Sequence, residues 1–224
     1  MKMHTLASAL VAAFALGGAG VAHAQAAGSM LIKAGWNKIM PKVDSSELSA
    51  PAIPGSTIGI KSASSLLLTA TYMFTNHISM EMMAGLPYKH DIVGTGAVDG
   101  VGKIGTVHQV SPTLMLQYRF FAQEAPLRPY LGAGVTWARF YDTEGSAALT
   151  AITNPGGTPT TIGSDTAFGA TFQGGLSYKL ADHWFLDAAI LKTYIKTDPV
   201  LSTGQTIEAK LNPVSVNLSV GYQF

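Results

Sequence analysis

The chain of 224 residues contains no cysteine, which excludes disulfide bonds, a thiolate nucleophile and cysteine-based zinc or iron–sulfur sites. Charge is also scarce. The 14 Lys plus Arg and 13 Asp plus Glu make up 12% of the chain, about half of the ~25% usual in soluble domains. A net charge of +1 without a long Lys or Arg run argues against nucleic acid as a partner.

A long hydrophobic run occurs only at the start of the chain. Lys2 precedes an apolar stretch at 6–21, and Ala22, His23 and Ala24 form an A-x-A cleavage site, a pattern typical of a secretory signal peptide. We expect residues 1–24 to be cleaved during export, leaving one domain over 25–224; a retained membrane anchor is the alternative. Beyond residue 24 no stretch approaches the ~18 apolar residues of a membrane helix.

The rest of the chain divides into eight segments in which apolar residues recur every second position. The clearest is the last, where Val214, Val216 and Leu218 alternate with Ser215 and Asn217. This period of two predicts strands with one apolar face. The segments are 30–40, 65–75, 78–90, 106–121, 127–141, 166–180, 184–196 and 207–224.

The connections between these segments alternate strictly between long and short. In order they have 24, 2, 15, 5, 24, 3 and 10 residues. Short turns at one end, long loops at the other and an even strand number are typical of an outer-membrane β-barrel. Each segment has at least 11 residues, enough for the ~9 to 11 that cross the hydrocarbon. We therefore predict an all-β fold, an eight-stranded antiparallel transmembrane β-barrel.

Aromatic residues support a membrane location. All 19 aromatic residues after residue 24 lie within the eight segments. They gather near the segment ends, which predicts two belts at the membrane interfaces; the alternative is that strands simply favour aromatic residues. The short-turn belt comprises Phe74, Phe120, Phe121, Tyr130, Tyr178, Trp184, Phe185, Tyr222 and Phe224, and the long-loop belt Trp36, Tyr88, Trp137, Phe140, Tyr141, Phe168 and Tyr194.

Seven stretches in the same order resemble the outer membrane protein W (OmpW) family of Gram-negative bacteria. They are LIKAG at 31–35, LTATYM at 68–73, SME at 79–81, LPYKH at 86–90, TVHQVSPTLM at 106–115, RPYLGAG at 128–134 and GYQF at 221–224. The resemblance implies an eight-stranded outer-membrane barrel that passes small hydrophobic molecules. It fades in the long loops, notably at 147–161, so a ligand preference set by loops does not carry over.

The chain ends on Phe224, with Tyr222 two positions before it. This ending looks like the C-terminal signal that the barrel-assembly machinery recognises. We therefore expect that machinery and outer-membrane lipid to be partners.

If the apolar face of each strand meets lipid, the other face lines the lumen. Five charges on that face lie near the short-turn end: Lys33, Glu81, Arg119, Lys179 and Asp187. In a narrow barrel, opposite charges at one level are expected to pair and form a closed floor. The floor either gates the lumen or only stabilises it.

Above this floor the inward residues are small or apolar. We predict a hydrophobic pocket that is open to the outside and closed below, because Met and Leu line adaptable apolar cavities; a filled core is the alternative. The predicted pocket residues are Leu67, Thr69, Met83, Gly85, Thr113, Met115 and Leu191.

Pro87 and Pro112 lie within the third and fourth predicted strands. Proline lacks the donor that a strand ladder needs, so each position loosens strand pairing. We therefore hypothesise a lateral exit there, through which an apolar solute leaves for the bilayer. The alternative is that both prolines are tolerated kinks.

Other activities receive little support from the sequence. His108 and Ser111 are three residues apart and point to opposite faces of a strand, so we expect no enzymatic activity. The histidines lack metal-ligand spacing, and we predict no metal or cofactor. A soluble lipocalin-like barrel and a non-transporting structural or adhesive barrel remain as alternatives.

Overall fold

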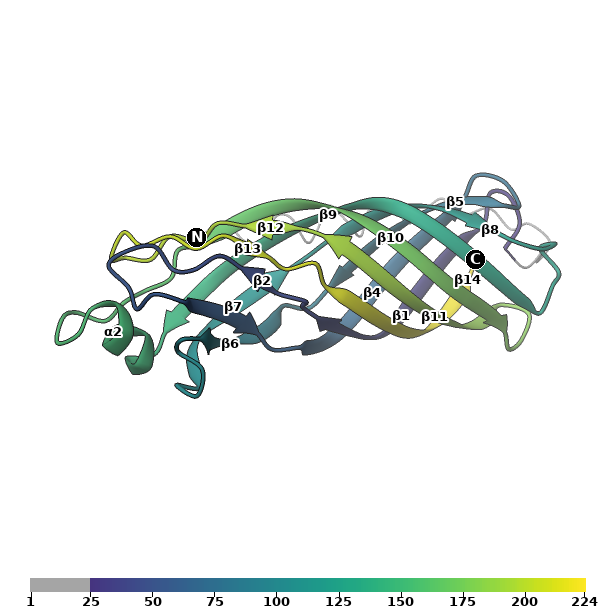
Figure 1. Ribbon diagram of the computed structural model, residues 1–224. Helices are drawn as coiled ribbons and strands as arrows, with labels where there is room; N and C mark the ends of the chain where they lie inside the picture. The colour runs from purple at the N-terminus through teal and green to yellow at the C-terminus, as the bar shows by residue number, and fades with distance from the viewer. Residues whose placement is uncertain (1–24) are drawn as a thin grey trace, which may run out of the picture.

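The computed structural model describes residues 25–224, and the predicted signal peptide lies outside them. Eight antiparallel strands form a closed barrel, because β10 pairs with both β9 and β11 and every other strand also has two neighbours. The predicted fold class is confirmed (Figure 1). The barrel strands are β1 (Met30–Met40), β4 (Ala63–Met73), β5 (Ile78–Gly85), β8 (Thr113–Arg119), β9 (Leu127–Gly145), β10 (Asp165–Lys179), β11 (Trp184–Tyr194) and β14 (Val214–Gln223).

The register aligns inward-facing positions at the same level of the barrel. Lys33 in β1 lies opposite Gly221 in β14 and opposite Thr69 in β4. Because successive side chains point to opposite faces, alternate residues of each strand are buried in the lumen. The outward positions carry exposed apolar side chains, as a wall facing lipid requires. They include Leu66, Leu68, Leu114, Leu116, Leu131, Val135, Ile190 and Leu218.

One part of the aromatic prediction is wrong. Tyr88, Tyr130, Phe140 and Phe185, assigned to the belts, are all buried. A position near a strand end fixes height along the barrel but not the face, and these four lie on the inward face. The exposed rings include Phe74, Phe121, Tyr178, Trp184 and Phe224 at the short-turn end and Trp36, Phe168 and Tyr194 at the long-loop end.

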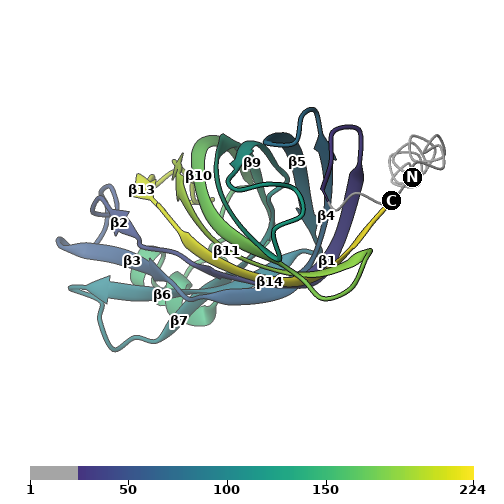
Figure 2. The same ribbon diagram turned by 90° about the vertical axis from the view of Figure 1, so that its right-hand side faces the viewer.

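The long-loop end carries more regular structure than the sequence indicated. The predicted strand 78–90 is divided into β5 and β6 (Tyr88–Gly96), and 106–121 into β7 (Lys103–Val110) and β8. The divisions fall at Pro87 and Pro112, where a ladder donor is missing. β6 pairs with β7 and with β3 (Ser56–Ile60), so the sheet continues past the barrel, as Figure 2 shows.

A second sheet and one helix complete this end. β2 (Asp44–Ser45), β13 (Ala209–Lys210) and β12 (Lys196–Thr197) form a three-stranded sheet. The helix α2 (Ala147–Thr153) begins after Ser146, whose side chain accepts a hydrogen bond from the Leu149 amide. Within residues 25–224, no helix has the length and hydrophobicity to cross a membrane.

Candidate functional site

A buried ion-pair cluster lies inside the lumen near the short-turn end. Lys33 Nζ lies 2.6 Å from Glu81 Oε2 and 3.0 Å from Asp187 Oδ1, and all three side chains are fully buried. Thr71 donates a hydrogen bond to Glu81 (2.8 Å) and Ser177 donates one to Asp187 (2.6 Å). The strands β1, β5 and β11 thus bring together three of the five residues predicted for the floor.

The ring of Tyr130 fills the space beside this cluster. Its hydroxyl donates to Asp187 Oδ1 at 2.9 Å. The guanidinium of Arg119 lies 4.8 Å from the ring centroid and the ammonium of Lys33 lies 5.8 Å from it, distances that suit cation–π attraction. Gly175 on β10 makes room, because a Cβ there would lie 2.3 Å from the ring.

Arg119 belongs to the floor but makes no ion pair among the described residues. Its guanidinium instead donates to neutral oxygens, namely Ser79 Oγ (3.2 Å), Gln117 Oε1 (2.9 Å), Ser177 Oγ (3.2 Å) and Gln25 Oε1 (3.2 Å). The expected pairing of opposite charges therefore holds for Lys33 only. Arg119 is linked to Asp187 through the hydroxyl of Ser177.

A second buried arginine, Arg128, lies below Arg119 and was not predicted from the sequence. It donates to the backbone carbonyls of Gln25 (3.2 Å), Phe120 (3.3 Å) and Asn76 and to the Gln25 side chain (3.1 Å). Arg128 shares the inward face of β9 with Tyr130. Arg128 lies two residues before Tyr130, so period-two alternation would have placed it inside if Tyr130 had been assigned to the inward face.

Lys179 is not part of the floor. It has the inward parity of β10 but lies at the strand's end, where its side chain is about one-third exposed. Its Nζ lies 3.5 Å from Asp182 in the adjacent turn. This placement corrects the expectation, because Lys179 is the last residue of β10, one inward position beyond Ser177, and its side chain reaches the adjacent turn rather than the network.

Above the floor, part of the predicted pocket is packed solid. Met115 is fully buried and packs with Tyr130, Met83 and Leu191. A Cβ added to Gly134 would lie 2.7 Å from Met115 Sδ, so the room left by this glycine is already taken. Thr69 is likewise buried at this level. Met115 and Thr69 therefore lie beneath the cavity rather than in its wall.

The other five predicted pocket residues line a real cavity, the lower pocket. Its wall also includes uncharged polar side chains, so it is less apolar than predicted. Beyond Leu67, Met83, Gly85, Thr113 and Leu191, the lining consists of Asn37, Ile39, Tyr88, Gln109, Ser111, Thr136, Ala138, Thr193, Ile195, Pro213 and Ser215.

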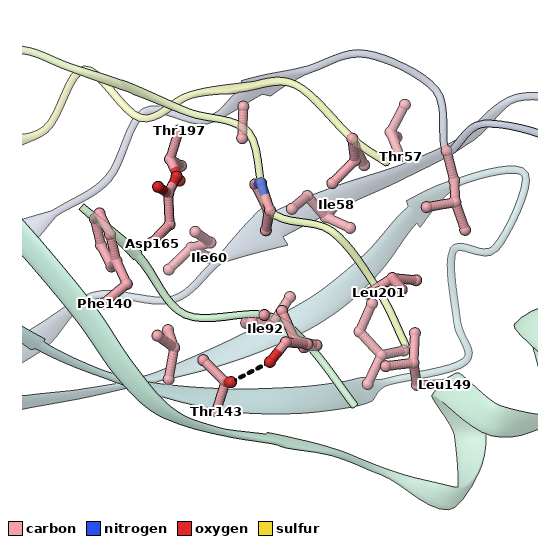
Figure 3. Close-up of a pocket in the computed structure, with 18 of the residues that line it drawn as sticks. Thr57, Ile58, Ile60, Ile92, Phe140, Thr143, Leu149, Asp165, Thr197 and Leu201 are labelled. Atoms are coloured by element: carbon pink, nitrogen blue, oxygen red, sulfur yellow. Dashed lines mark hydrogen bonds between the residues drawn. The ribbon is translucent and has the colours of Figure 1, made fainter. Parts of the chain in front are cut away.

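A second and more apolar cavity, the upper pocket, lies towards the long loops (Figure 3). All four long connections contribute side chains to it, including Ile58, Val98, Leu149 and Leu201. This pocket was not predicted from the sequence, because loop residues carry no periodic signal. Its remaining lining includes Leu48, Ile60, Ile92, Ile104, Val107, Phe140, Ile152, Ile162, Pro199, Ile207, Ala209 and Leu211.

One charged residue, Asp165, borders the upper pocket within the described chain. Its carboxylate accepts hydrogen bonds from the amides of Thr166 (2.7 Å) and Asp198 (3.1 Å) and from the hydroxyl of Thr197. The charge is thus held by donors in the wall, and the chamber itself stays apolar.

The two pockets adjoin. On β9, Ala138 lines the lower pocket and Phe140, the next inward residue, lines the upper pocket. In the segment after β11, Ile195 lines the lower pocket and Thr197 lines the upper pocket. Ala138 and Ile195 also belong to the apolar cluster around the upper pocket. A solute in the upper pocket is therefore next to the lower one.

The two prolines predicted to form an exit flank a break in the wall of the lower pocket. Pairing of β5 with β8 ends at Met83 and Thr113, and pairing of β6 with β7 resumes at Tyr88 and Gln109. Between them, residues 84–87 face 110–112 without a regular ladder. Gly85 and Ser111 from this interval line the lower pocket.

The remaining candidates lie elsewhere. Tyr222 stacks on His183, and Phe224 packs against Tyr222 at the outer short-turn edge. His108 faces outward, 3.3 Å from Asp142, while Ser111 faces the lumen. Over residues 25–224 no group of three His, Asp or Glu side chains is arranged to hold a metal ion.

Comparison with known proteins agrees with this architecture. The sequence profile of the OmpW family matches residues 26–224. Outer membrane protein W of Salmonella typhi is 32% identical over 237 aligned residues that cover both chains fully. The crystal structure of OprG from Pseudomonas aeruginosa superposes with a TM-score of 0.80 at 26% identity, covering 91% of this chain and 99% of that chain.

A more distant relative carries a functional name. The dibenzothiophene metabolism operon protein PahQ of Pseudomonas aeruginosa is 23% identical over 180 residues, which cover 79% of each chain. The profile match, the full-length relative and the eight-stranded barrel together identify the family: this chain belongs to the OmpW family of outer-membrane proteins of Gram-negative bacteria.

Proposed function

We propose that this barrel binds small hydrophobic molecules from outside the cell and conducts them passively into the outer membrane. The solute enters the upper pocket, moves to the adjoining lower pocket and leaves laterally into the bilayer. The observation that carries the proposal is the upper pocket, whose lining is mostly aliphatic or aromatic. Such a chamber favours apolar solutes, because their transfer from water removes apolar surface from solvent.

The floor supports a lateral rather than a vertical route. A solute continuing downward would have to displace the ion pairs of Lys33 with Glu81 and Asp187. Breaking a buried ion pair leaves an uncompensated charge, which is costly. The wall beside the lower pocket offers less resistance, because strand pairing is interrupted between Pro87 and Pro112.

The name of one relative points the same way. PahQ is named for an operon of dibenzothiophene metabolism, and dibenzothiophene is an apolar compound.

We further propose that residues 1–24 direct export and are cleaved, and that the barrel-assembly machinery recognises Tyr222 and Phe224.

The test is to block the junction between the two pockets. Ala138→Phe places a ring between them, so uptake of radiolabelled decane by Gram-negative cells should fall to the level of cells without the protein. Ala133→Phe is the matched control, since Ala133 lies on the same strand but faces outward, and this variant should transport like the wild type.

Both variants must first pass a folding check by heat-modifiable gel mobility. If wild-type cells take up decane no faster than cells lacking the protein, the transport proposal fails and a structural or adhesive barrel is favoured. If Ala138→Phe folds and transports normally, the solute does not pass through the two pockets.

A further inference from the structure

The lower pocket differs from the upper one in its chemistry. No Asp, Glu, Lys, Arg or His is among its lining residues within the described chain. Half of the lining nevertheless consists of hydroxyl and amide side chains that can form hydrogen bonds. These are Asn37, Tyr88, Gln109, Ser111, Thr113, Thr136, Thr193 and Ser215.

Four threonine hydroxyls form a continuous hydrogen-bonded chain, and three of the four residues, all but Thr171, line this pocket. Thr113 Oγ1 lies 2.8 Å from Thr136 Oγ1, which lies 2.6 Å from Thr171 Oγ1, which lies 3.0 Å from Thr193 Oγ1. The four residues lie on the consecutive strands β8, β9, β10 and β11, and all are buried. The chain therefore runs across four of the eight barrel strands.

This chain can reverse its direction. Each hydroxyl has one proton to donate, and Thr113 Oγ1 also lies 3.3 Å from the carbonyl oxygen of Ser111. If Thr113 donates to that carbonyl, every proton is used within the chain and Thr193 offers an acceptor to the pocket. If the protons run the other way, Thr193 offers a donor. Thr193 can therefore either accept a hydrogen bond from a ligand or donate one to it.

The opposite wall presents a fixed acceptor. β1 lies four strands from β9 in either direction around the barrel, and Asn37 on β1 donates from Nδ2 to the Tyr88 hydroxyl at 2.8 Å. Its Oδ1 is buried and has no hydrogen-bond partner among the described residues. A buried acceptor without a partner is costly, so a ligand that donates a hydrogen bond would relieve it.

From these groups we infer that the lower pocket is a binding site for the uncharged polar end of an amphiphile, such as a primary alcohol. Its hydrocarbon tail would lie in the adjoining upper pocket. A carboxylate is disfavoured, because a charge moved out of water needs a partner that this lining lacks. The inference rests on the proposed function and narrows its solute class from hydrocarbons to neutral amphiphiles.

The experiment compares uptake of three probes, 1-decanol, decane and decanoate, by cells producing each variant. Wild-type cells should take up decanol faster than decane, with decanoate at background. Thr136→Val keeps the shape of the side chain but breaks the threonine chain, so the decanol-to-decane ratio should fall about fivefold to tenfold, the effect of one lost hydrogen bond. Asn37→Leu is a second variant with the same expectation.

Thr69→Val is the matched control. Thr69 is a buried lumen threonine, but its hydroxyl has no partner among the described residues and it lines neither pocket. Its ratio should stay at the wild-type value. A photoreactive diazirine derivative of decanol adds an independent readout, since it should label lower-pocket residues such as Leu191 and Ile195 in purified barrels in lipid nanodiscs.

The outcomes separate the two proposals. Lower-pocket labelling without uptake above background would support the site and refute transport. Normal decane uptake with an unchanged ratio in folded Thr136→Val and Asn37→Leu, or decanoate uptake equal to that of decanol, would overturn the inference and leave the proposed function standing.

Discussion

The two ends of the lumen differ in the kind of side chain that they bury. At the short-turn end, Lys33, Glu81 and Asp187 are fully buried and charged, and the surrounding polar groups are arranged to satisfy them. At the long-loop end, Ile92, Val107 and Leu201 form an apolar cluster that still encloses a cavity. One end is polar and filled, whereas the other is apolar and open.

This difference follows from what each end is made of. Short turns hold the strands of the floor in register, so charged atoms can be placed at 2.6 to 3.0 Å from one another. Long connections converge over the upper pocket, and apolar contacts tolerate such variable walls because they are not directional. Buried ion pairs thus mark the filled part of the lumen, and aliphatic side chains mark the part that encloses a cavity.

The largest expected effect comes from breaking the floor. Lys33→Met leaves Glu81 and Asp187 buried without their ammonium partner, so the barrel should lose about 3–5 kcal/mol of stability. Urea titration of the barrel refolded into phospholipid vesicles measures this loss. Lys179→Met is the control, because its ion pair with Asp182 is partly exposed; it should change stability by less than about 0.5 kcal/mol.

Equal stability losses in Lys33→Met and Lys179→Met would contradict the distinction between a buried floor and an exposed rim. A folded Lys33→Met that takes up decane like the wild type would assign the floor a purely structural role, which is the alternative to gating.

An intermediate effect is expected at the boundary between the two ends. Pro87→Val combined with Pro112→Val restores two backbone donors beside the lower pocket, each worth about 1 kcal/mol if it finds an acceptor. The wall should tighten, so the urea midpoint should rise and decane uptake should fall towards that of cells without the protein.

Pro129→Val is the control for this change. Pro129 lies within β9 but outside the interrupted pairing, so uptake should be unaffected. Wild-type uptake in the folded double variant would refute the lateral exit and support the view that both prolines are tolerated kinks.

The short-turn end of the lumen could be predicted from the sequence better than the long-loop end, for a physical reason. Period-two alternation assigns a face, so it placed Lys33, Glu81, Arg119 and Asp187 inside. It failed at Lys179, because alternation does not indicate which inward positions lie at the solvent-exposed end of a strand. The four inward-facing aromatic residues were misplaced, because their height along the strands was weighed without their face.

The upper pocket could not be predicted in the same way. Its walls come from residues such as Leu48, Leu149 and Leu201, which are far apart in the sequence and lie outside the predicted strands. None of them belongs to a segment with a period of two that would assign it to an inward face. Only the three-dimensional arrangement of all four connections brings them together, and no local pattern encodes that arrangement.

The smallest expected effect concerns an ion pair at the open end. Lys196 Nζ lies 2.7 Å from Glu208 Oε2, a shorter separation than that of Lys33 and Asp187, but both side chains are about half exposed. The hydrogen bond from Lys196 lowers the pKa of Glu208. The stabilisation that this ion pair gives is therefore complete at neutral pH and is lost as the pH falls through that lowered pKa.

Water and salt screen an exposed ion pair, so its contribution to stability is small. Glu208→Gln should therefore change the amide exchange protection of Ala209 and Lys210 by no more than about twofold at pH 7, and it should abolish the small loss of protection that the wild type shows on acidification. A large change at pH 7 would mean that exposure does not separate the two ion pairs, and that the open end also depends on charge for its structure.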